Sequence, residues 1–265
     1  MSAPEPGLDP VLGGRVVLAQ PAAGLRAAID PVLLAAAVDA APGERAADLG
    51  CGVGTAGLCL MARVPELSVL GIDHDPALVA LAEANGRRNR CAGFAARCLD
   101  LLADAAALGA LAPVDHVLTN PPFHDAAASD PSPDPARARA TVAGFPLDAW
   151  LRGAATLLAP RGSLAVIYRA DRLPGLLAAL PRGLGAVTVV PLWPHDGEPA
   201  KRVIVTAVKG SRAPASLTAG LVLHQRDGGY TAAAEALLRQ GAGLGEVVAG
   251  LWKPRARRRA AARAG

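Results

Sequence analysis

Short apolar runs alternate with longer amphipathic segments along most of the chain. The runs are rich in Val, Ile, Leu and Ala and are bounded by Gly, Pro or Asp, which is typical of buried strands. Strands are predicted at residues 15–19, 45–49, 68–72, 94–99, 115–119, 163–169, 186–192 and 202–208. Helices are predicted where apolar positions recur at helical spacing between proline or glycine breaks, at residues 29–40, 55–64, 75–90, 147–158 and 173–180.

The order of these elements predicts a mostly parallel sheet with helices on both faces. The last two predicted strands are joined by WPHDGEPAK, which is too short for a crossover helix, so they are predicted to be antiparallel neighbours. A seventh strand inserted antiparallel resembles the class I methyltransferase fold, whereas dinucleotide dehydrogenase domains end in a sixth parallel strand. We therefore predict a Rossmann-like α/β fold with a seven-stranded, mostly parallel sheet and an antiparallel last strand.

The sequence gives less information about the N-terminal segment and about where the helices begin. Residues 1–14 show no clear pattern and are predicted to be loose. Asp30 and Asp75 each stand directly before a proline at the start of a predicted helix. Both are therefore predicted to cap their helices.

Three alternate glycines follow the strand at residues 45–49, in the sequence DLGCGVG. Gly50, Gly52 and Gly54 permit a sharp turn and a close approach of a ligand to the backbone. The segment GVGTAG also fits the dinucleotide fingerprint GxGxxG, so a nicotinamide-dependent oxidoreductase stays open as an alternative. Asp48 instead favours S-adenosylmethionine as the ligand of this loop. A carboxylate at this position repels a pyrophosphate and tolerates the cationic amino acid portion of S-adenosylmethionine.

Two further carboxylates follow the next strands. Asp73 ends the strand in GIDHD, 21 residues after Gly52, and is predicted to accept hydrogen bonds from the ribose of an adenosyl group. This role serves either cofactor and does not distinguish them. Asp100 follows the third strand and is predicted to accept from an adenine amino group, the alternative being a solvated loop carboxylate.

The most specific motif is TNPPFH, which follows the strand at residues 115–119. Two consecutive prolines stiffen the backbone and fix the direction of the Pro121 carbonyl, beside the side-chain carbonyl of Asn120. Two acceptors held together suit the two hydrogens of an exocyclic amino group, and Phe123 offers a flat face on which a base can stack. The predicted catalytic residues are Asn120, Pro121, Pro122 and Phe123.

Composition excludes several classes of protein. Hydrophobic residues make up 52% of the chain and charged residues 19%, which is typical of a folded protein and not of a disordered one. No apolar run reaches the ~20 residues of a bilayer span and no signal peptide is recognised, so we expect a cytoplasmic protein without a membrane partner. The four cysteines form no Cys-x-x-Cys pair and are predicted to be reduced thiols, with no metal site.

The positive charge is concentrated at the end of the chain. The net charge is +4, and residues 253–263 contain six Lys and Arg and no acid, so the rest of the chain carries −2. Residues 253–265 are predicted to form a basic, disordered tail. The tail is either a solvated end or an electrostatic arm for a nucleic acid, because phosphate contacts supply most non-specific affinity.

Together, DLGCGVG, GIDHD and TNPPF resemble the methyltransferases that act on amino groups of adenine, guanine or glutamine. The chain is more closely similar to the bacterial tRNA adenine-N6 methyltransferases, in four further segments. These are QPAAGLRAAIDPVLL at 20–34, the pair Ala138-Arg139, EPAKRVIV at 198–205 and LVLHQRDGGYT at 221–231. The resemblance implies S-adenosylmethionine as cofactor, RNA as partner with tRNA favoured, and a single methyltransferase domain over residues 1–252 that includes the N-terminal extension.

The resemblance also implies how the amino nitrogen is activated. Hydrogen bonds from the amino group to Asn120 and the Pro121 carbonyl favour the pyramidal nitrogen of the transition state, and no metal is required. His124, Arg137 and Arg139, in the long segment at 124–146, are candidate contacts to the base or its phosphates, the alternative being a surface loop without such contacts.

One departure from the family pattern leaves the target base open. Members of this family often have Tyr at the position of Phe123, and NPPFH also resembles ribosomal-RNA guanine-N2 methyltransferases. Guanine N2 or a small molecule therefore stays an alternative to adenine N6.

Overall fold

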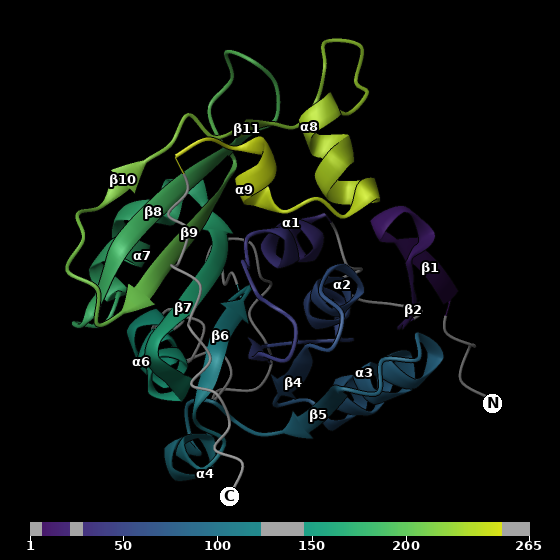
Figure 1. The fold of residues 1–265 in the computed structure, drawn as a ribbon, viewed down its shortest axis with the longest axis vertical. Coiled ribbons are helices and arrows are strands. Elements are labelled where there is room, and N and C mark those ends of the chain that lie inside the picture. Colours follow the sequence, from purple (N-terminus) through teal and green to yellow (C-terminus); the bar gives the residue numbers. More distant parts are fainter. Residues whose placement is uncertain (1–6, 22–28, 123–145, 251–265) are drawn as a thin grey trace, which may run out of the picture.

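Nine strands form one sheet in the part of the chain that the structure describes. The structure is a computed structural model that describes residues 7–21, 29–122 and 146–250. The strands lie in the order β10-β8-β9-β7-β6-β3-β4-β5, and β11 also pairs with β8 (Figure 1). Their bounds are β3 (Arg45–Leu49), β4 (Ser68–Asp73), β5 (Phe94–Cys98), β6 (Val114–Thr119), β7 (Leu158–Arg169), β8 (Leu184–Trp193), β9 (Arg202–Lys209), β10 (Ser216–Leu217) and β11 (Leu221–Val222).

The predicted fold class is confirmed, including the antiparallel last strand. Neighbouring strands from β5 to β7 are parallel, and β9 runs antiparallel to both β7 and β8. The short strands β10 and β11 extend the sheet beyond the seven predicted strands, on the outer edge of β8. They were not predicted because two residues are too few to produce a periodic pattern.

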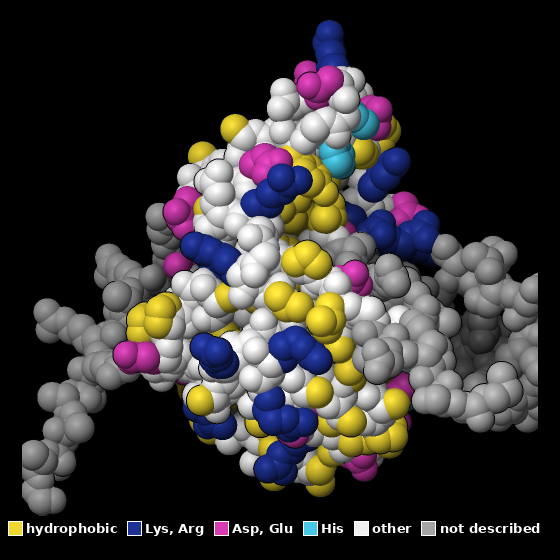
Figure 2. All heavy atoms as spheres, turned by 90° about the vertical axis from the view of Figure 1, so that its right-hand side faces the viewer, with side chains coloured by type: hydrophobic (Ala, Val, Ile, Leu, Met, Phe, Trp, Pro, Cys, Tyr) yellow, Lys and Arg dark blue, Asp and Glu magenta, His cyan; other side chains and the backbone are white. Residues whose placement is uncertain are grey.

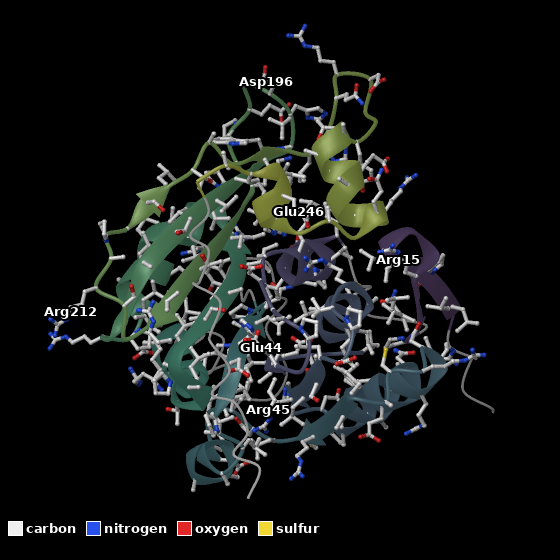
Figure 3. All side chains as sticks on the ribbon, in the orientation of Figure 1. Arg15, Glu44, Arg45, Asp196, Arg212 and Glu246 are labelled. Atoms are coloured by element: carbon white, nitrogen blue, oxygen red, sulfur yellow. The ribbon has the colours of Figure 1, made fainter. Side chains whose placement is uncertain are left out.

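All the parallel strands end at one edge of the sheet. In open α/β sheets ligands bind at this carboxyl edge. Figure 3 labels Asp196 on the loop that projects beyond β8 at this edge, and Glu44 and Arg45 at the start of β3 on the opposite side. The carboxyl edge is therefore where the predicted site residues are to be sought.

Helices cover both faces of the sheet. The first face is covered by α1, α2 and the C-terminal segment, and the second by α4, α6 and α7. Successive residues of a central strand point to opposite faces, as Leu118 does to the first core and Val117 to the second. The helical elements are α1 (Asp30–Ala36), α2 (Thr55–Arg63), α3 (Pro76–Arg88), α4 (Ala105–Gly109), α6 (Leu147–Leu157), η2 (Ala170–Arg172), α7 (Leu173–Ala179), α8 (Ala232–Glu235), the π-helical turn η3 (Ala236–Gln240) and α9 (Leu244–Val247).

The prediction that residues 1–14 are loose is wrong for residues 7–14. Strands β1 (Gly7–Val11) and β2 (Val16–Gln20) form a separate antiparallel hairpin around the short helical turn η1 (Leu12–Gly14). Pro10 and Asp9 in β1 are unfavourable strand residues, so the sequence alone does not reveal this strand.

Two side-chain amides hold this hairpin on α3. The Asn85 amide accepts from the Ala19 N–H at 2.7 Å and donates to the Ala19 carbonyl at 3.0 Å, and Asn89 bonds Val17 in the same way at 2.8 Å. Asn85 also donates to the carbonyl of Val53 at 3.0 Å. The hairpin, α3 and the glycine loop are thus joined through one buried amide.

Of the two predicted helix caps, one is confirmed and one is wrong. The Asp75 carboxylate accepts from the backbone N–H groups of Ala77 and Leu78 at the start of α3. Asp30 is instead the first residue of α1 and makes no capping bond. Its carboxylate accepts from Arg202 Nε at 2.9 Å, a partner 172 residues away that local sequence cannot indicate.

Two expectations from composition are also addressed by the structure. All four cysteines are free thiols, as predicted. Within residues 7–21, 29–122 and 146–250 no helix is long and apolar enough to cross a membrane.

Candidate active site

The glycine loop between β3 and α2 has backbone conformations that favour glycine. The φ angles are 70°, 53° and 87° at Gly50, Gly52 and Gly54. The Gly50 and Cys51 N–H groups donate to the carbonyl of Ile72, at 2.8 and 3.1 Å, and so tie the loop to the end of β4. A Cβ on Gly50 would lie 3.2 Å from Trp150, whereas a Cβ on Gly52 would meet no described atom within 4 Å. The space at Gly52 is therefore open to a ligand.

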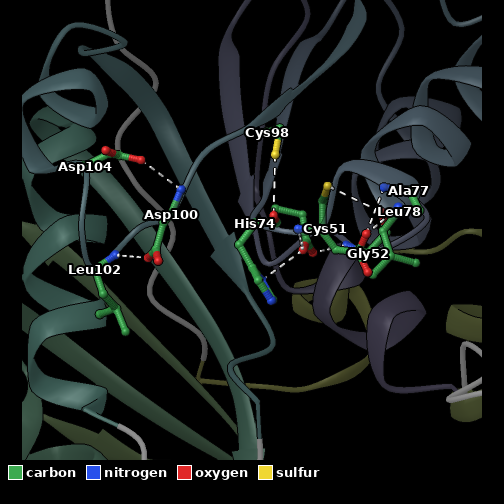
Figure 4. Close-up of polar contacts among 11 residues, drawn as sticks. Cys51, Gly52, His74, Ala77, Leu78, Cys98, Asp100, Leu102 and Asp104 are labelled. Atoms are coloured by element: carbon green, nitrogen blue, oxygen red, sulfur yellow. Dashed lines mark hydrogen bonds and ion pairs between the residues drawn. The ribbon is translucent and has the colours of Figure 1, made fainter. Parts of the chain in front are cut away.

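Asp73 lies at the end of β4 and is bonded directly to this loop. Its carboxylate is buried and accepts from the Gly52 N–H at 2.8 Å through one oxygen and from the Asp75 N–H at 3.1 Å through the other. The ring of His74, whose side chain is 81% exposed, places Nδ1 3.3 Å from the same carboxylate (Figure 4). A carboxylate has about four lone-pair sites, so Asp73 retains capacity for further donors.

Asp48 lies beneath the loop and not in the open space. Its side chain is buried and accepts from the Gly57 N–H in the first turn of α2 at 2.9 Å. Burial, opposed by the bond from the Gly57 N–H and reinforced by the negative charge of Asp73, raises the pKa of Asp48 to about 7. Burial, together with the charges of Asp48 and Asp73, also raises the pKa of the Cys51 thiol well above its usual range, so this thiol is neutral.

We expect Asp48→Asn to remove a pH dependence of stability. The pKa of about 7 lies above the ordinary aspartate value of about 3.9, so the folded protein holds a proton that the unfolded chain has lost between these pH values. This contribution to stability is full below about pH 4 and is lost as the pH rises through about 7. Asparagine keeps the acceptor for the Gly57 N–H without a charge to desolvate.

The measurement is thermal unfolding of both proteins across this pH range. Relative to the wild type, the variant should gain stability as the pH rises from about 4 to about 8, by at most on the order of 4 kcal/mol. A difference between the two proteins that does not change with pH would contradict the buried, protonated carboxyl.

Asp100 reaches the same edge but is engaged in its own turn. It is exposed, and its Oδ1 accepts from the N–H groups of Leu102 at 2.8 Å and Ala103 at 3.2 Å, while its own N–H donates to Asp104 (Figure 4). These bonds shape the entry to α4. A contact to an adenine amino group stays a prediction for Asp100.

Asn120 follows β6, next to the glycine loop. Its side-chain carbonyl oxygen is buried and has no hydrogen-bond partner among the described residues. Leaving a buried acceptor unpaired costs about 1–3 kcal/mol, so such an atom is expected where a ligand supplies the donor. Pro121 is buried and Pro122 exposed, directly after it.

Two residues that the sequence analysis did not select hold this segment in place. The Thr119 hydroxyl donates to the Leu49 carbonyl at 2.8 Å, and Trp150 Nε1 donates to the same hydroxyl at 3.0 Å. The Trp150 ring also packs against Gly50. Thr119 and Trp150 therefore fix the Asn120 backbone relative to the glycine loop. The signal that was available is that Trp150 is one of only three tryptophans in the chain.

The structure brings the glycine loop, Asp73 and Asn120 together at one edge of the sheet. Four predicted site residues and one predicted segment lie outside the described residues. The residues are Phe123, His124, Arg137 and Arg139, and the segment is the basic tail at 253–265. No group of three or more His, Cys, Asp or Glu side chains suited to a metal ion occurs among the residues that the structure describes.

Comparison with known proteins identifies related sequences and folds. The family model described as methyltransferase small domain matches residues 26–190. The tRNA1(Val) (adenine(37)-N6)-methyltransferase of Porphyromonas gingivalis is 31% identical over 80% of this chain and 86% of that protein. A crystal structure from Agrobacterium tumefaciens, described as a predicted O-methyltransferase, is similar with a TM-score of 0.68 and 26% identity, over 81% of this chain and 97% of that one.

Another similarity covers only part of a longer protein. The 23S rRNA (uracil(1939)-C(5))-methyltransferase of Azoarcus sp. is 40% identical over 38% of this chain. The matched segment spans 24% of that enzyme.

Proposed function

Because the chain belongs to the methyltransferase small domain family and is an S-adenosylmethionine-dependent methyltransferase, we propose that it methylates an exocyclic amino nitrogen of an RNA base. The base that we propose is adenine N6 in a tRNA. The oxidoreductase alternative left open by GxGxxG is wrong, because the family and the related folds are those of methyltransferases.

The buried carbonyl oxygen of Asn120 carries this proposal. Among the described residues it is an unpaired acceptor at the carboxyl edge, joined through Thr119 and Leu49 to the glycine loop. An exocyclic amino group supplies the N–H donor that this oxygen lacks. A substrate hydroxyl group has one hydrogen to donate and would bond only one of the two oxygens. An amino group has two, one for Asn120 Oδ1 and one for the Pro121 carbonyl, as the sequence analysis predicts.

The residues at the edge fit the cofactor. The open space at Gly52 allows close approach to the backbone, and the buried Asp73 carboxylate retains lone pairs for the ribose hydroxyls. When bound, S-adenosylmethionine supplies an electrophilic methyl group on a cationic sulfur. The buried Asp48 carboxyl below the loop adds negative charge when ionised, and a bound cation favours that form.

The amino nitrogen of adenine is a poor nucleophile because its lone pair is delocalised into the ring. Asn120 Oδ1 and the Pro121 carbonyl would accept its two hydrogens and favour the pyramidal nitrogen, whose lone pair is available to the methyl group. Bound S-adenosylmethionine would supply the methyl group to this lone pair, and the Asn120 and Pro121 oxygens would hold the amino hydrogens in place. One of these hydrogens would then pass to solvent as a proton once the nitrogen carries the methyl group. Fixed acceptors of this kind need little reorganisation during the reaction, which is the source of their effect.

The finer assignment rests on similarity in sequence. The relative from P. gingivalis, which covers most of this chain, is named for adenine-N6 methylation of a tRNA. We propose the same substrate class here, with Phe123 stacking on the base, His124, Arg137 and Arg139 contacting the base or its phosphates, and Asp100 near the cofactor adenine. We also propose one domain over residues 1–252, with the tail at 253–265 as an electrostatic arm for the RNA.

The test is nucleoside mass spectrometry of tRNA and rRNA from a strain that lacks the gene. The purified protein and S-adenosylmethionine should then restore one methylated nucleoside, N6-methyladenosine, in the tRNA fraction. Restoration of N2-methylguanosine in rRNA would replace the proposed base. Absence of methylation in both fractions would overturn the assignment of RNA as substrate.

A further inference from the structure

Three rings gather at the carboxyl end of β8, away from the residues assigned to catalysis. We call His195, His224 and Tyr230 the ring cluster. The centroids of His195 and His224 lie 5.6 Å apart, and those of His224 and Tyr230 lie 4.9 Å apart with 25° between the planes. Tyr230 is one of only two tyrosines in the chain, and each member of this cluster is only partly buried. Tyr230 packs against the hydrophobic core, so core packing accounts for one ring and leaves the two histidines unexplained.

The backbone around the cluster is held firmly. The N–H groups of Leu223 and His224 donate to the carbonyls of Trp193 and Pro194, at 2.8 and 2.9 Å. The Gln225 side chain closes the hairpin by donating to the Tyr230 carbonyl at 2.8 Å. The rings are thus presented in a fixed arrangement, and binding would cost little side-chain or loop ordering.

His195, whose ring is tilted by 37° from that of His224, is the open end of the cluster. The His195 side chain is 40% exposed, and its buried Nδ1 lies 3.3 Å from Glu198 Oε1 without making a hydrogen bond to any described residue. The polar contacts of His195 therefore do not explain why a ring is held at this position. Figure 2 shows histidine side chains exposed on the upper part of the molecule, with basic and acidic side chains around them.

The cluster and Asn120 share one edge of the sheet. β11 pairs in parallel with the end of β8, which places His224 beyond the carboxyl end of that strand. β8 and β6 run in the same direction and are separated by β9 and β7. Three strand spacings of about 4.8 Å separate them, or about 14 Å. A substrate longer than one nucleotide can thus reach both places.

We propose that the ring cluster is a second binding site for the substrate RNA, where an unpaired base beside the target nucleotide stacks on His195. This inference rests on the proposed function. Every base has a flat face, and stacking on a protein ring is a general means of holding unpaired nucleotides. Cations lie close by, since the Arg239 guanidinium is 6.0 Å from the Tyr230 ring centroid and Arg226 is exposed in the hairpin turn.

Acidic side chains limit what charge alone contributes at this site. Asp196 and Glu198 lie in the same loop as His195, and Asp227 is in the same turn as Arg226. Phosphate attraction is therefore partly cancelled. Stacking, and not counterion release, should supply the affinity of this site for RNA. Loss of the site should therefore weaken RNA binding without changing the salt dependence of that binding.

The test compares His195→Ala with His195→Phe, and uses tRNA from the deletion strain as the probe. His195→Ala should weaken tRNA binding and raise the KM for tRNA about five- to 150-fold, the range of one base–aromatic stack. The kcat at saturating tRNA, the affinity for S-adenosylmethionine and the salt dependence of tRNA binding should not change. His195→Phe should retain the affinity, because it retains the ring.

Asp196→Ala, at the adjacent exposed position of the same loop, is the matched control and should not weaken tRNA binding, because it removes a negative charge and leaves the ring of His195 in place. Wild-type tRNA affinity in His195→Ala, or an equal loss in His195→Phe, would overturn the stacking site while the proposed function stands. Tyr230→Leu gives a second variant, which should weaken tRNA binding without changing cofactor affinity. Failure of the proposed function is seen separately, in a wild-type protein that methylates neither RNA fraction, and would overturn this inference with it.

Discussion

Asn120→Ala is expected to lower kcat for methyl transfer by about a hundred- to a thousandfold, the size of loss found when one group aimed at transition-state charge is removed. The reason is that the variant lacks the acceptor that holds one hydrogen of the amino group. Affinity for S-adenosylmethionine should stay nearly the same, because Asn120 makes no bond to the glycine loop or to Asp73 through its side chain. Single-turnover transfer at saturating RNA, together with calorimetric titration of the cofactor, measures the two quantities separately.

Two further variants show whether the acceptor itself is responsible. Asn120→Asp keeps an oxygen at the same position and should retain more activity than Asn120→Ala. Trp150→Phe removes the bond to the Thr119 hydroxyl and the part of the ring that packs against Gly50, and it should lower kcat less, since Trp150 is a positioning residue. Methyl transfer by Asn120→Ala near the wild-type rate would mean that the segment after β6 is only a turn.

The sequence predicted the central elements because their pattern is local. The strands that are buried on both faces form continuous apolar runs, and residues 45–49 match the observed β3 in full. The cap at Asp75 was also predictable, because the side chain bonds to N–H groups two and three residues away. The antiparallel direction of β9 relative to β8 was predictable because the segment that joins them is too short to hold a crossover helix.

The features that were missed depend on contacts between distant parts of the chain. The N-terminal hairpin is held by Asn85 and Asn89 on α3, far along the chain, which no local pattern of residues 7–14 reveals. Trp150 bonds to Thr119, 31 residues earlier in the chain.

Asp48 shows the same limit within the candidate site. A carboxylate before a glycine loop is consistent with a ligand contact, and only the fold shows that its side chain bonds to the Gly57 N–H. The sequence predicts the glycine loop, Asp73 and Asn120 at the ends of neighbouring strands, which is where these residues lie in the structure, but it does not give the direction of each side chain.

Asp73→Asn is expected to weaken binding of S-adenosylmethionine about tenfold or more, because a hydrogen bond to a charged group contributes about 1.5–3 kcal/mol. Asparagine still offers an oxygen to the Gly52 N–H, which Asp73 now holds at 2.8 Å, so the loop should keep its conformation. Its NH2 group cannot accept from the Asp75 N–H as the second carboxylate oxygen does, so some thermal stability should be lost. The variant loses the negative charge and some of the lone pairs that we propose for the ribose hydroxyls. Calorimetric titration of the cofactor measures this loss directly.

Asp75→Asn is the matched control, since it removes a neighbouring charge two residues along the chain. Asparagine caps helices about as well as aspartate, so α3 should be unaffected and cofactor affinity unchanged. If Asp73→Asn and Asp75→Asn weakened cofactor binding equally, the cause would be the loss of negative charge near the loop and not the loss of a specific hydrogen bond to Asp73. If neither variant changed the affinity, the cofactor ribose would not be held by Asp73. A loss of cofactor affinity confined to Asp73→Asn, in a variant that is still folded at the temperature of the titration, is the outcome that a buried carboxylate at the end of β4 predicts. Of the two carboxylates, only Asp73 is bonded to the loop that faces the open space at Gly52.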